Sequence, residues 1–229
     1  FRTMTDIIKQ HLGHVISDRI GALSGPNLAK EIAEEKVAGT VIASGDESIN
    51  IEIKSMLSSK TFKVFSSHDI QGVELAGALK NIYAICCGIA HAKLVGENAL
   101  GFIVTRSMAE MSRFAVAKGA DPITFLGLAG MGDLMATCTS KLSRNFQLGE
   151  LIAEDFSLID AKEKVGQVAE GARTLEVVYH EANKMNVSMP LVNSLYKILY
   201  SDSSSDQLMK DLLDHPNEVD VEFTYKKEK

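Results

Sequence analysis

The spacing of hydrophobic and polar positions changes along the chain, and the change predicts two kinds of structure. In the first third, short β-branched or aromatic runs alternate with amphipathic stretches, which indicates strands between helices. Strands are predicted at 20–23, 40–43 and 61–65, and helices at 4–12, 28–34 and 46–57. This alternation is typical of βαβ units and favours a parallel sheet. About 70 residues of this kind correspond to the back half of a doubly wound α/β domain.

From Gly72 onward the strand signal disappears and the periodicity favours helices only. We predict helices at 73–90, 101–118, 121–128, 143–152, 170–185, 190–199 and 206–213. The pattern therefore predicts the C-terminal part of an α/β domain at 1–70, followed by an all-helical domain at 71–229.

One predicted helix is apolar on every face. The segment 75–90 reads LAGALKNIYAICCGIA, and only Lys80 and Asn81 bring strongly polar side chains, with the Tyr83 hydroxyl as a weaker third. This composition indicates a buried helix. A buried ammonium is costly unless it is paired or used, and buried lysines can exchange protons near neutral pH. Lys80 is therefore either a catalytic group, or a structural lysine that reaches a helix end or a carboxylate.

Composition excludes several classes of function. The 229 residues are 45% hydrophobic and 24% charged, as in ordinary soluble proteins, and the net charge of −6 argues against a nucleic-acid partner. No run reaches the roughly 18 apolar residues of a membrane span. The three cysteines and six histidines lack metal-ligand spacing, so we expect no metal site and a reducing, cytoplasmic environment. The chain starts at Phe1 with a helical pattern at once, which we interpret as a cut.

Two loops between the later helices carry candidate chemistry. Gly130 and Gly132 allow a tight turn that delivers Asp133 at a fixed point, either as a partner for a cation or hydroxyl or as a helix cap. The sequence Ser143-Arg144-Asn145 precedes a predicted helix, where it suits a phosphate but also ordinary capping.

A third candidate loop follows the first predicted strand. The run 24–27, Ser-Gly-Pro-Asn, could hold a ligand at the carboxyl edge of the sheet or form a simple turn, with Asn27 capping the next helix. No GxGxxG follows any predicted strand. If a dinucleotide binds, its main phosphate loop is not in this chain.

Several of these segments together resemble one family. LSGPNLAKEI, GVELAGALKNIYAI, RSMAEMSR, GADPITFLGLAGMGDLMATCTS, SRN and GQVAEGART are similar, in this order, to the bacterial NAD(P)-dependent glycerol-3-phosphate dehydrogenases, over residues 2–199. The resemblance implies an oxidoreductase that reduces dihydroxyacetone phosphate to sn-glycerol 3-phosphate for phospholipid synthesis, with NAD or NADP. It also implies a Rossmann-type domain and a helical domain like the C-terminal one of 6-phosphogluconate dehydrogenase. The oligomeric state stays open, because the apolar helix at 75–90 could be covered by the chain itself or by a second subunit in a homodimer.

The resemblance also implies roles for individual residues. Lys80 takes the position of the general acid/base that protonates the substrate carbonyl oxygen, and Asp133 that of the aspartate that orients it. The positions implied for substrate binding are Gly25, Asn27, Lys80, Asn81, Asp133, Thr137, Ser143, Arg144 and Asn145, and those for cofactor binding are Ala29, Arg144, Val168 and Glu170.

The chain also departs from the family pattern. The family's glycine-rich pyrophosphate loop and a second substrate-binding lysine do not occur in it, so we expect poor NAD(P)H binding and little turnover from the chain alone. Two alternatives remain open: a dehydrogenase of the hydroxyisobutyrate or 6-phosphogluconate type, against which the GDL and SRN segments argue, and a non-catalytic helical interaction module. An in-frame GxGxxG immediately upstream would support the enzyme over the module.

Overall fold

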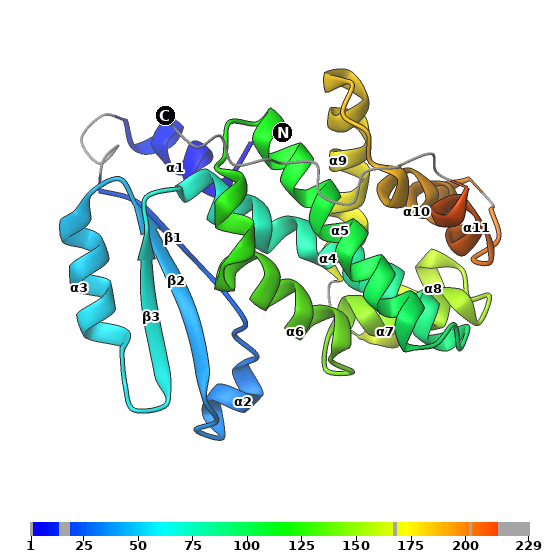
Figure 1. Ribbon diagram of the computed structural model, residues 1–229, viewed down its shortest axis with the longest axis horizontal. Helices are drawn as coiled ribbons and strands as arrows, with labels where there is room; N and C mark the ends of the chain where they lie inside the picture. Colours follow the sequence, from blue (N-terminus) through cyan, green and yellow to red (C-terminus); the bar gives the residue numbers. More distant parts are fainter. Residues whose placement is uncertain (1, 14–18, 167–168, 202, 215–229) are drawn as a thin grey trace, which may run out of the picture.

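A small three-stranded sheet with flanking helices lies beside a larger helical body (Figure 1). The structure is a computed structural model and describes residues 2–13, 19–166, 169–201 and 203–214. The sheet part comprises α1 (Met4–Leu12), β1 (Gly21–Ser24), α2 (Ala29–Ala33), β2 (Ala38–Ser44), α3 (Glu47–Leu57) and β3 (Phe62–Ser67). The α/β part expected from the sequence is therefore present, with bounds close to those predicted.

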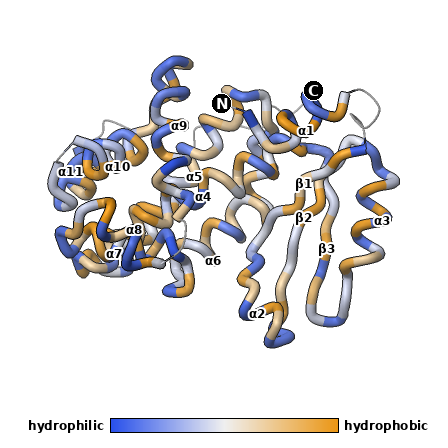
Figure 2. The backbone as a smooth tube through the Cα atoms, turned by 180° about the vertical axis from the view of Figure 1, so that it is seen from behind, coloured by the Kyte–Doolittle hydropathy of each residue, from blue (hydrophilic) through white to orange (hydrophobic). Residues whose placement is uncertain are grey.

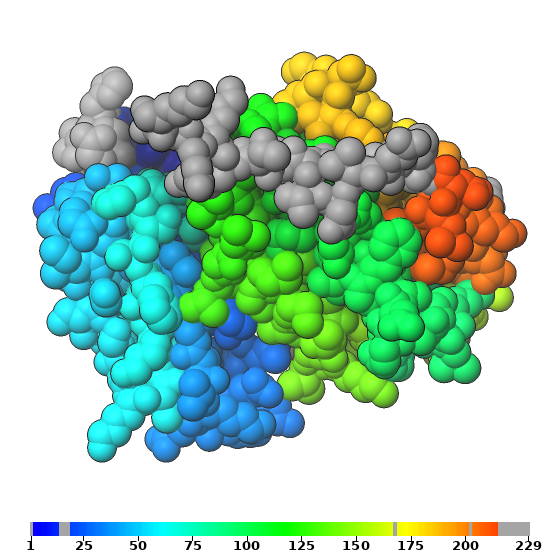
Figure 3. Space-filling model, viewed as in Figure 1, coloured from blue at the N-terminus to red at the C-terminus, as the bar shows by residue number. Residues whose placement is uncertain are grey.

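The remaining described elements are all helical, as predicted. They are α4 (Ile70–Ala92), α5 (Glu97–Ala117), a 3₁₀ turn η2 (Pro122–Leu126), a π turn η3 (Leu128–Gly132), α6 (Asp133–Thr139), α7 (Arg144–Ala153), α8 (Leu158–Val165), α9 (Glu170–Met185), α10 (Pro190–Tyr200) and α11 (Gln207–Leu213). A domain boundary at 70/71 stays a prediction; it falls at the start of α4. Figure 3 shows the blue and cyan sheet part in direct contact with the green helical part.

The expectation of a parallel sheet is right for one strand pair and wrong for the other. β2 and β3 are parallel, but β1 runs antiparallel to β2, with Ser24 opposite Val41. The connection at 25–37 has thirteen residues, about the minimum for a parallel crossover, but its helix α2 has only five residues and spans about 7.5 Å. The chain does not return along β1 before β2 begins, so the two strands run in opposite directions.

Three local predictions also need correction. Asn27 does not cap α2: the N-cap is Leu28 without a side-chain hydrogen bond, and the Asn27 amide donates to Thr40 instead. The helix expected at 121–128 is divided into η2 and η3, because the backbone is extended at Gly127. The helix α8 was not predicted, although the Ser157 cap and the helical spacing of Leu158, Ala161 and Val165 were available signals.

The apolar helix α4 forms the centre of the fold. It packs against α5, α6, α7 and α9, and its residues Leu79, Ile82, Ala84 and Ile85 are fully buried. By length and composition alone α4 could cross a membrane, but most of it is enclosed by the other helices, as in the core of a globular protein. Outer elements such as α3 alternate between hydrophobic and hydrophilic residues instead (Figure 2). The prediction of a buried helix is confirmed.

A pair of glycines brings α7 onto α4 at backbone distance. A Cβ atom on Gly88 would lie 2.0 Å from the Phe146 carbonyl oxygen, and one on Gly149 would lie 2.1 Å from the Ile85 carbonyl oxygen. No larger residue fits at either position without separating the helices. This close crossing places the first turn of α7 beside the middle of α4, where Lys80 and Asn81 are located.

Candidate active site

Lys80 forms an ion pair with Asp133 inside the fold. Its Nζ lies 2.5 Å from Asp133 Oδ2; the Lys80 side chain is 19% exposed and that of Asp133 3%. Burial raises the pKa of the Asp133 carboxyl above its usual value, and the nearby ammonium offsets part of that rise. The two residues are 53 positions apart in sequence but share one site.

The turn η3 explains why Asp133 reaches α4. A Cβ on Gly130 would lie 2.2 Å from the Phe125 carbonyl oxygen, so only glycine allows this turn. The Asp133 side chain makes no capping hydrogen bond for α6, whose N-cap is Gly132. Of the two interpretations of Asp133, the cation partner is therefore confirmed and the helix cap is wrong.

Two hydroxyl groups complete the surroundings of the Asp133 carboxylate. Ser24 Oγ donates to Oδ2 at 3.4 Å, and Thr137 Oγ1 lies 3.4 Å from Oδ1 while donating to the Asp133 carbonyl oxygen at 2.6 Å. Thr137 was predicted for the site, whereas Ser24 was not. Its position directly before Gly25, in the loop already singled out, was the available signal.

A cavity of about 800 Å³ opens beside the ion pair, between α1, β1, α4 and α9. This volume is in the range of small-molecule sites, roughly 300–1,000 Å³. Its lining includes Ser24, Gly25, Asn27, Lys80, Asp133 and Arg173. The cavity thus brings together four of the predicted substrate-binding positions, and adds Ser24 and Arg173, which sequence reasoning did not assign.

The loop after β1 is held against β2 and leaves one acceptor unused. A Cβ on Gly25 would lie 2.9 Å from the Thr40 Cα, so a glycine is required there. Asn27 Nδ2 donates to Thr40 Oγ1 at 2.9 Å, while the buried Asn27 Oδ1 has no partner among the described residues. A buried amide oxygen of this kind is suited to accept a hydrogen bond from a ligand.

A second polar group joins three helices and does not belong to the lining of the cavity. Asn145 Nδ2 donates to Asn81 Oδ1 at 3.0 Å, and Asn145 Oδ1 accepts from the Gly171 N–H at 2.9 Å. One amide therefore links α4, α7 and α9. Ser143 Oγ caps α7 by accepting from the Phe146 N–H at 3.4 Å. The structure thus brings Asn81 and Asn145 together, and their role in substrate binding stays a prediction.

The described members of the predicted cofactor set lie on the surface. Arg144 is the first residue of α7 and is exposed, as are Ala29 and Glu170, which begin α2 and α9. Val168 lies outside the described residues. The three described positions among these, Ala29, Arg144 and Glu170, do not line the cavity. They are accessible to a dinucleotide, but the part of the chain that the structure describes has no glycine-rich phosphate loop to complete such a site.

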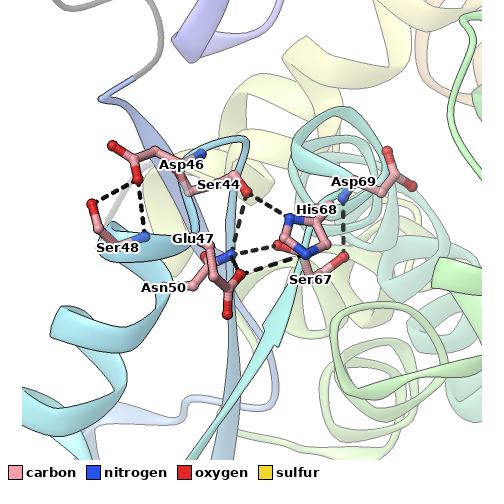
Figure 4. Close-up of polar contacts among 8 residues, drawn as sticks. All are labelled: Ser44, Asp46, Glu47, Ser48, Asn50, Ser67, His68 and Asp69. Carbon is pink, nitrogen blue, oxygen red and sulfur yellow. Dashed lines mark hydrogen bonds and ion pairs between the residues drawn. The ribbon is translucent and has the colours of Figure 1, made fainter.

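A separate polar cluster lies at the carboxyl ends of β2 and β3 (Figure 4). Asn50 Nδ2 lies 3.3 Å from the carbonyl oxygens of both Ser44 and Ser67, and the His68 ring contacts the Ser44 carbonyl at 3.3 Å. Asp46 caps α3 through the Ser48 N–H at 2.9 Å. These side chains serve the ends of the strands and the start of a helix. The described residues include no group of three or more His, Cys, Asp or Glu that could hold a metal.

Comparison with known proteins agrees with the geometry. A family model described as the NAD-dependent glycerol-3-phosphate dehydrogenase C-terminus matches residues 69–210, and the N-terminus model of the same family matches 1–50. Curated proteins named glycerol-3-phosphate dehydrogenase [NAD(P)+] from Alcanivorax borkumensis and Pseudomonas putida are 50% and 46% identical over 223 residues, which is 97% of this chain and 64% of each relative.

A solved structure shows the same arrangement of elements. The crystal structure of glycerol-3-phosphate dehydrogenase from Coxiella burnetii superposes with a TM-score of 0.82 at 34% identity, covering 85% of this chain and 60% of that one. The chain thus spans less than two thirds of the length of these relatives. The C-terminal match contains Lys80, Asp133 and the segment 143–145. The chain therefore belongs to the NAD-dependent glycerol-3-phosphate dehydrogenase family.

Proposed function

We propose that this chain supplies the substrate-binding and proton-transferring part of an enzyme that interconverts dihydroxyacetone phosphate and sn-glycerol 3-phosphate. The observation that carries the proposal is the buried Lys80–Asp133 pair at the wall of the cavity. An ion pair removed from water is costly, so its place beside an open cavity favours a chemical role over a structural one.

In this mechanism Lys80 is the general acid for reduction. Its ammonium donates a proton to the carbonyl oxygen of the substrate, which becomes the hydroxyl of the product, and in the reverse direction the neutral amine takes that proton back. NADH or NADPH, when bound, supplies the hydride. Asp133 directs the ammonium and stabilises its charge, with Ser24 and Thr137 as further donors to the carboxylate.

Recognition of the substrate is assigned to polar groups around this pair. We assign the hydroxyl end of the substrate to Asn27, whose buried Oδ1 is without a partner among the described residues, and to Gly25. We assign its phosphate to the start of α7, where the helix N-terminus and a guanidinium both favour an anion. The phosphate-binding positions are Ser143, Arg144 and Asn145, with Asn81 beside them.

We assign the cofactor to the predicted surface positions Ala29, Arg144, Val168 and Glu170. The described members of this set are exposed and therefore accessible to a ligand. The rest of its site must come from residues beyond those of this chain. We further propose that the enzyme acts in the cytoplasm, in glycerophospholipid synthesis, and as a homodimer; light scattering after size-exclusion chromatography gives the oligomeric state directly.

The test uses a chimera, in which the part of the Alcanivorax relative that precedes its matching segment is joined to this chain. We expect the chimera to oxidise NADH with dihydroxyacetone phosphate, and much less well with dihydroxyacetone, which lacks the phosphate. The decrease in absorbance of the reduced nicotinamide measures the rate. A chimera that folds, as shown by circular dichroism, but does not turn over would contradict the proposal and favour an interaction module.

A further inference from the structure

We propose that Ser24 is a positioning residue for the proton-transferring pair: its hydroxyl holds the Asp133 carboxylate toward Lys80. The inference rests on the function proposed above. Ser24 Oγ donates to Asp133 Oδ2 at 3.4 Å, and that same oxygen accepts from Lys80 Nζ at 2.5 Å. Among the described residues, the Asp133 carboxylate is the only hydrogen-bond partner found for this hydroxyl.

The fold holds the backbone of Ser24 in a defined place. Its carbonyl oxygen accepts from Thr40 Oγ1 at 3.0 Å, and Thr40 is in turn bonded to Asn27 at 2.9 Å. Thr40 is fully buried in β2. A chain of hydrogen bonds therefore runs from the loop that lines the cavity, through the sheet, to the end of β1. A serine in an ordinary turn does not need such a fixed backbone.

The neighbouring helix is shaped to admit the Ser24 hydroxyl. A Cβ on Gly77 would lie 2.6 Å from Ser24 Oγ, which is closer than a Cβ atom approaches another heavy atom. A side chain at position 77 would therefore displace the hydroxyl. Gly77 is one turn before Lys80 on α4. The glycine thus lets the end of β1 approach α4 at the level of the ion pair, and directs Ser24 between the helix and Asp133.

The hydroxyl favours the ionised form of Asp133. The polar groups that face this carboxylate are Lys80 from α4, Ser24 from β1 and Thr137 from α6, and all three lower its pKa against the larger effect of burial. Without Ser24 the pKa of Asp133 rises further, because one donor to the anion is lost. A protonated Asp133 no longer directs the ammonium. On acidification, a variant without the Ser24 hydroxyl should therefore lose activity at a higher pH than the unmodified enzyme.

The experiment compares Ser24→Ala with Ser67→Ala, which removes a hydroxyl at the end of a different strand, β3. In the chimera we expect Ser24→Ala to lower kcat about threefold to tenfold, to change KM for dihydroxyacetone phosphate less than about twofold, and to move the acid limb of the kcat/KM profile up by about half a pH unit. Ser67→Ala should leave all three unchanged. An unchanged acid limb in Ser24→Ala would overturn the inference.

A second measurement separates this inference from the proposed function. The carboxyl ¹³C signal of Asp133 in the chain alone reports its titration, and its midpoint should be higher in Ser24→Ala than in the unmodified chain. An equal midpoint overturns the positioning role whether or not the chimera is active. If Ser24→Ala does not fold, Ser24→Cys takes its place, since a thiol is only somewhat larger than the hydroxyl but donates weakly. Loss of activity in the unmodified chimera, by contrast, counts against the proposed function alone.

Discussion

Replacing Glu110 with glutamine should remove a pH-dependent loss of stability. Glu110 on α5 is 1% exposed and joins three helices. Its carboxylate accepts from the N–H groups of Leu191 at 2.6 Å and Val192 at 3.3 Å, at the start of α10, and from the Tyr83 hydroxyl on α4 at 3.2 Å. Burial raises the pKa of Glu110 to about 7, although these donors and Arg113 oppose the rise.

The direction of the pH effect on stability follows from comparing the protonation of Glu110 in the folded and unfolded states. Between pH 4.5, the ordinary value for a glutamate here, and about 7, Glu110 is protonated in the folded state but ionised in the unfolded chain. The free energy of unfolding therefore decreases as the pH rises through this window and is constant above it. At 1.36 kcal/mol per pH unit the whole decrease is about 3 kcal/mol.

Glutamine reproduces the protonated acid and does not titrate. Its oxygen can accept from the Leu191 N–H and its amide can donate to the Tyr83 hydroxyl oxygen, while the weaker 3.3 Å bond from the Val192 N–H is lost, as it is when the acid is protonated on that oxygen. Urea unfolding of the chain at pH 5 and pH 8, followed by circular dichroism, measures the effect. The stability lost between these pH values should be about 2 to 3 kcal/mol smaller for Glu110→Gln than for the unmodified chain. Glu52→Gln on the exposed face of α3 makes the same charge change and should behave like the unmodified chain. Equal losses in Glu110→Gln and the unmodified chain would refute a neutral Glu110.

Three further predictions test the site and the core. In the chimera, Lys80→Ala should lower kcat by at least about a hundredfold with little effect on KM for NADH, because proton donation acts mainly in the transition state. A kcat near its original value in steady-state kinetics would exclude Lys80 as the general acid. Arg144→Ala should raise KM for dihydroxyacetone phosphate about tenfold or more, and an unchanged KM would place the phosphate elsewhere. Gly149→Ala should destabilise the chain to urea by about 3 kcal/mol or more, because the new Cβ meets the Ile85 carbonyl oxygen. Gly101→Ala in α5, where a Cβ meets nothing within 4 Å, should be neutral or slightly stabilising, and equal effects of the two glycine changes would contradict the close crossing.

The spacing of hydrophobic residues predicted an element correctly where the residues of that element alone determine its structure. The 16 residues of α9 have the predicted bounds, because their apolar spacing and the flanking residues define a helix without help from the rest of the chain. The antiparallel direction of β1 was missed, since no property of the residues 20–23 distinguishes the two directions. The direction is set by how the chain folds back between β1 and β2 in the folded structure.

The same distinction applies to the proposed site. The apolar run around Lys80 already showed that a charge is buried and needs a partner or a use, because the cost of desolvation depends mainly on the composition of the helix. The family motifs marked the candidate positions. Those motifs also paired Asp133 with Lys80, but which hydroxyl meets the Asp133 carboxylate was decided only by the tertiary structure. Ser24 and Asp133 are separated by 109 residues and meet because η3, Gly77 and the register of β1 bring three elements to one point. Contacts at this separation depend on how elements pack, and periodicity within an element contains no information about its neighbours.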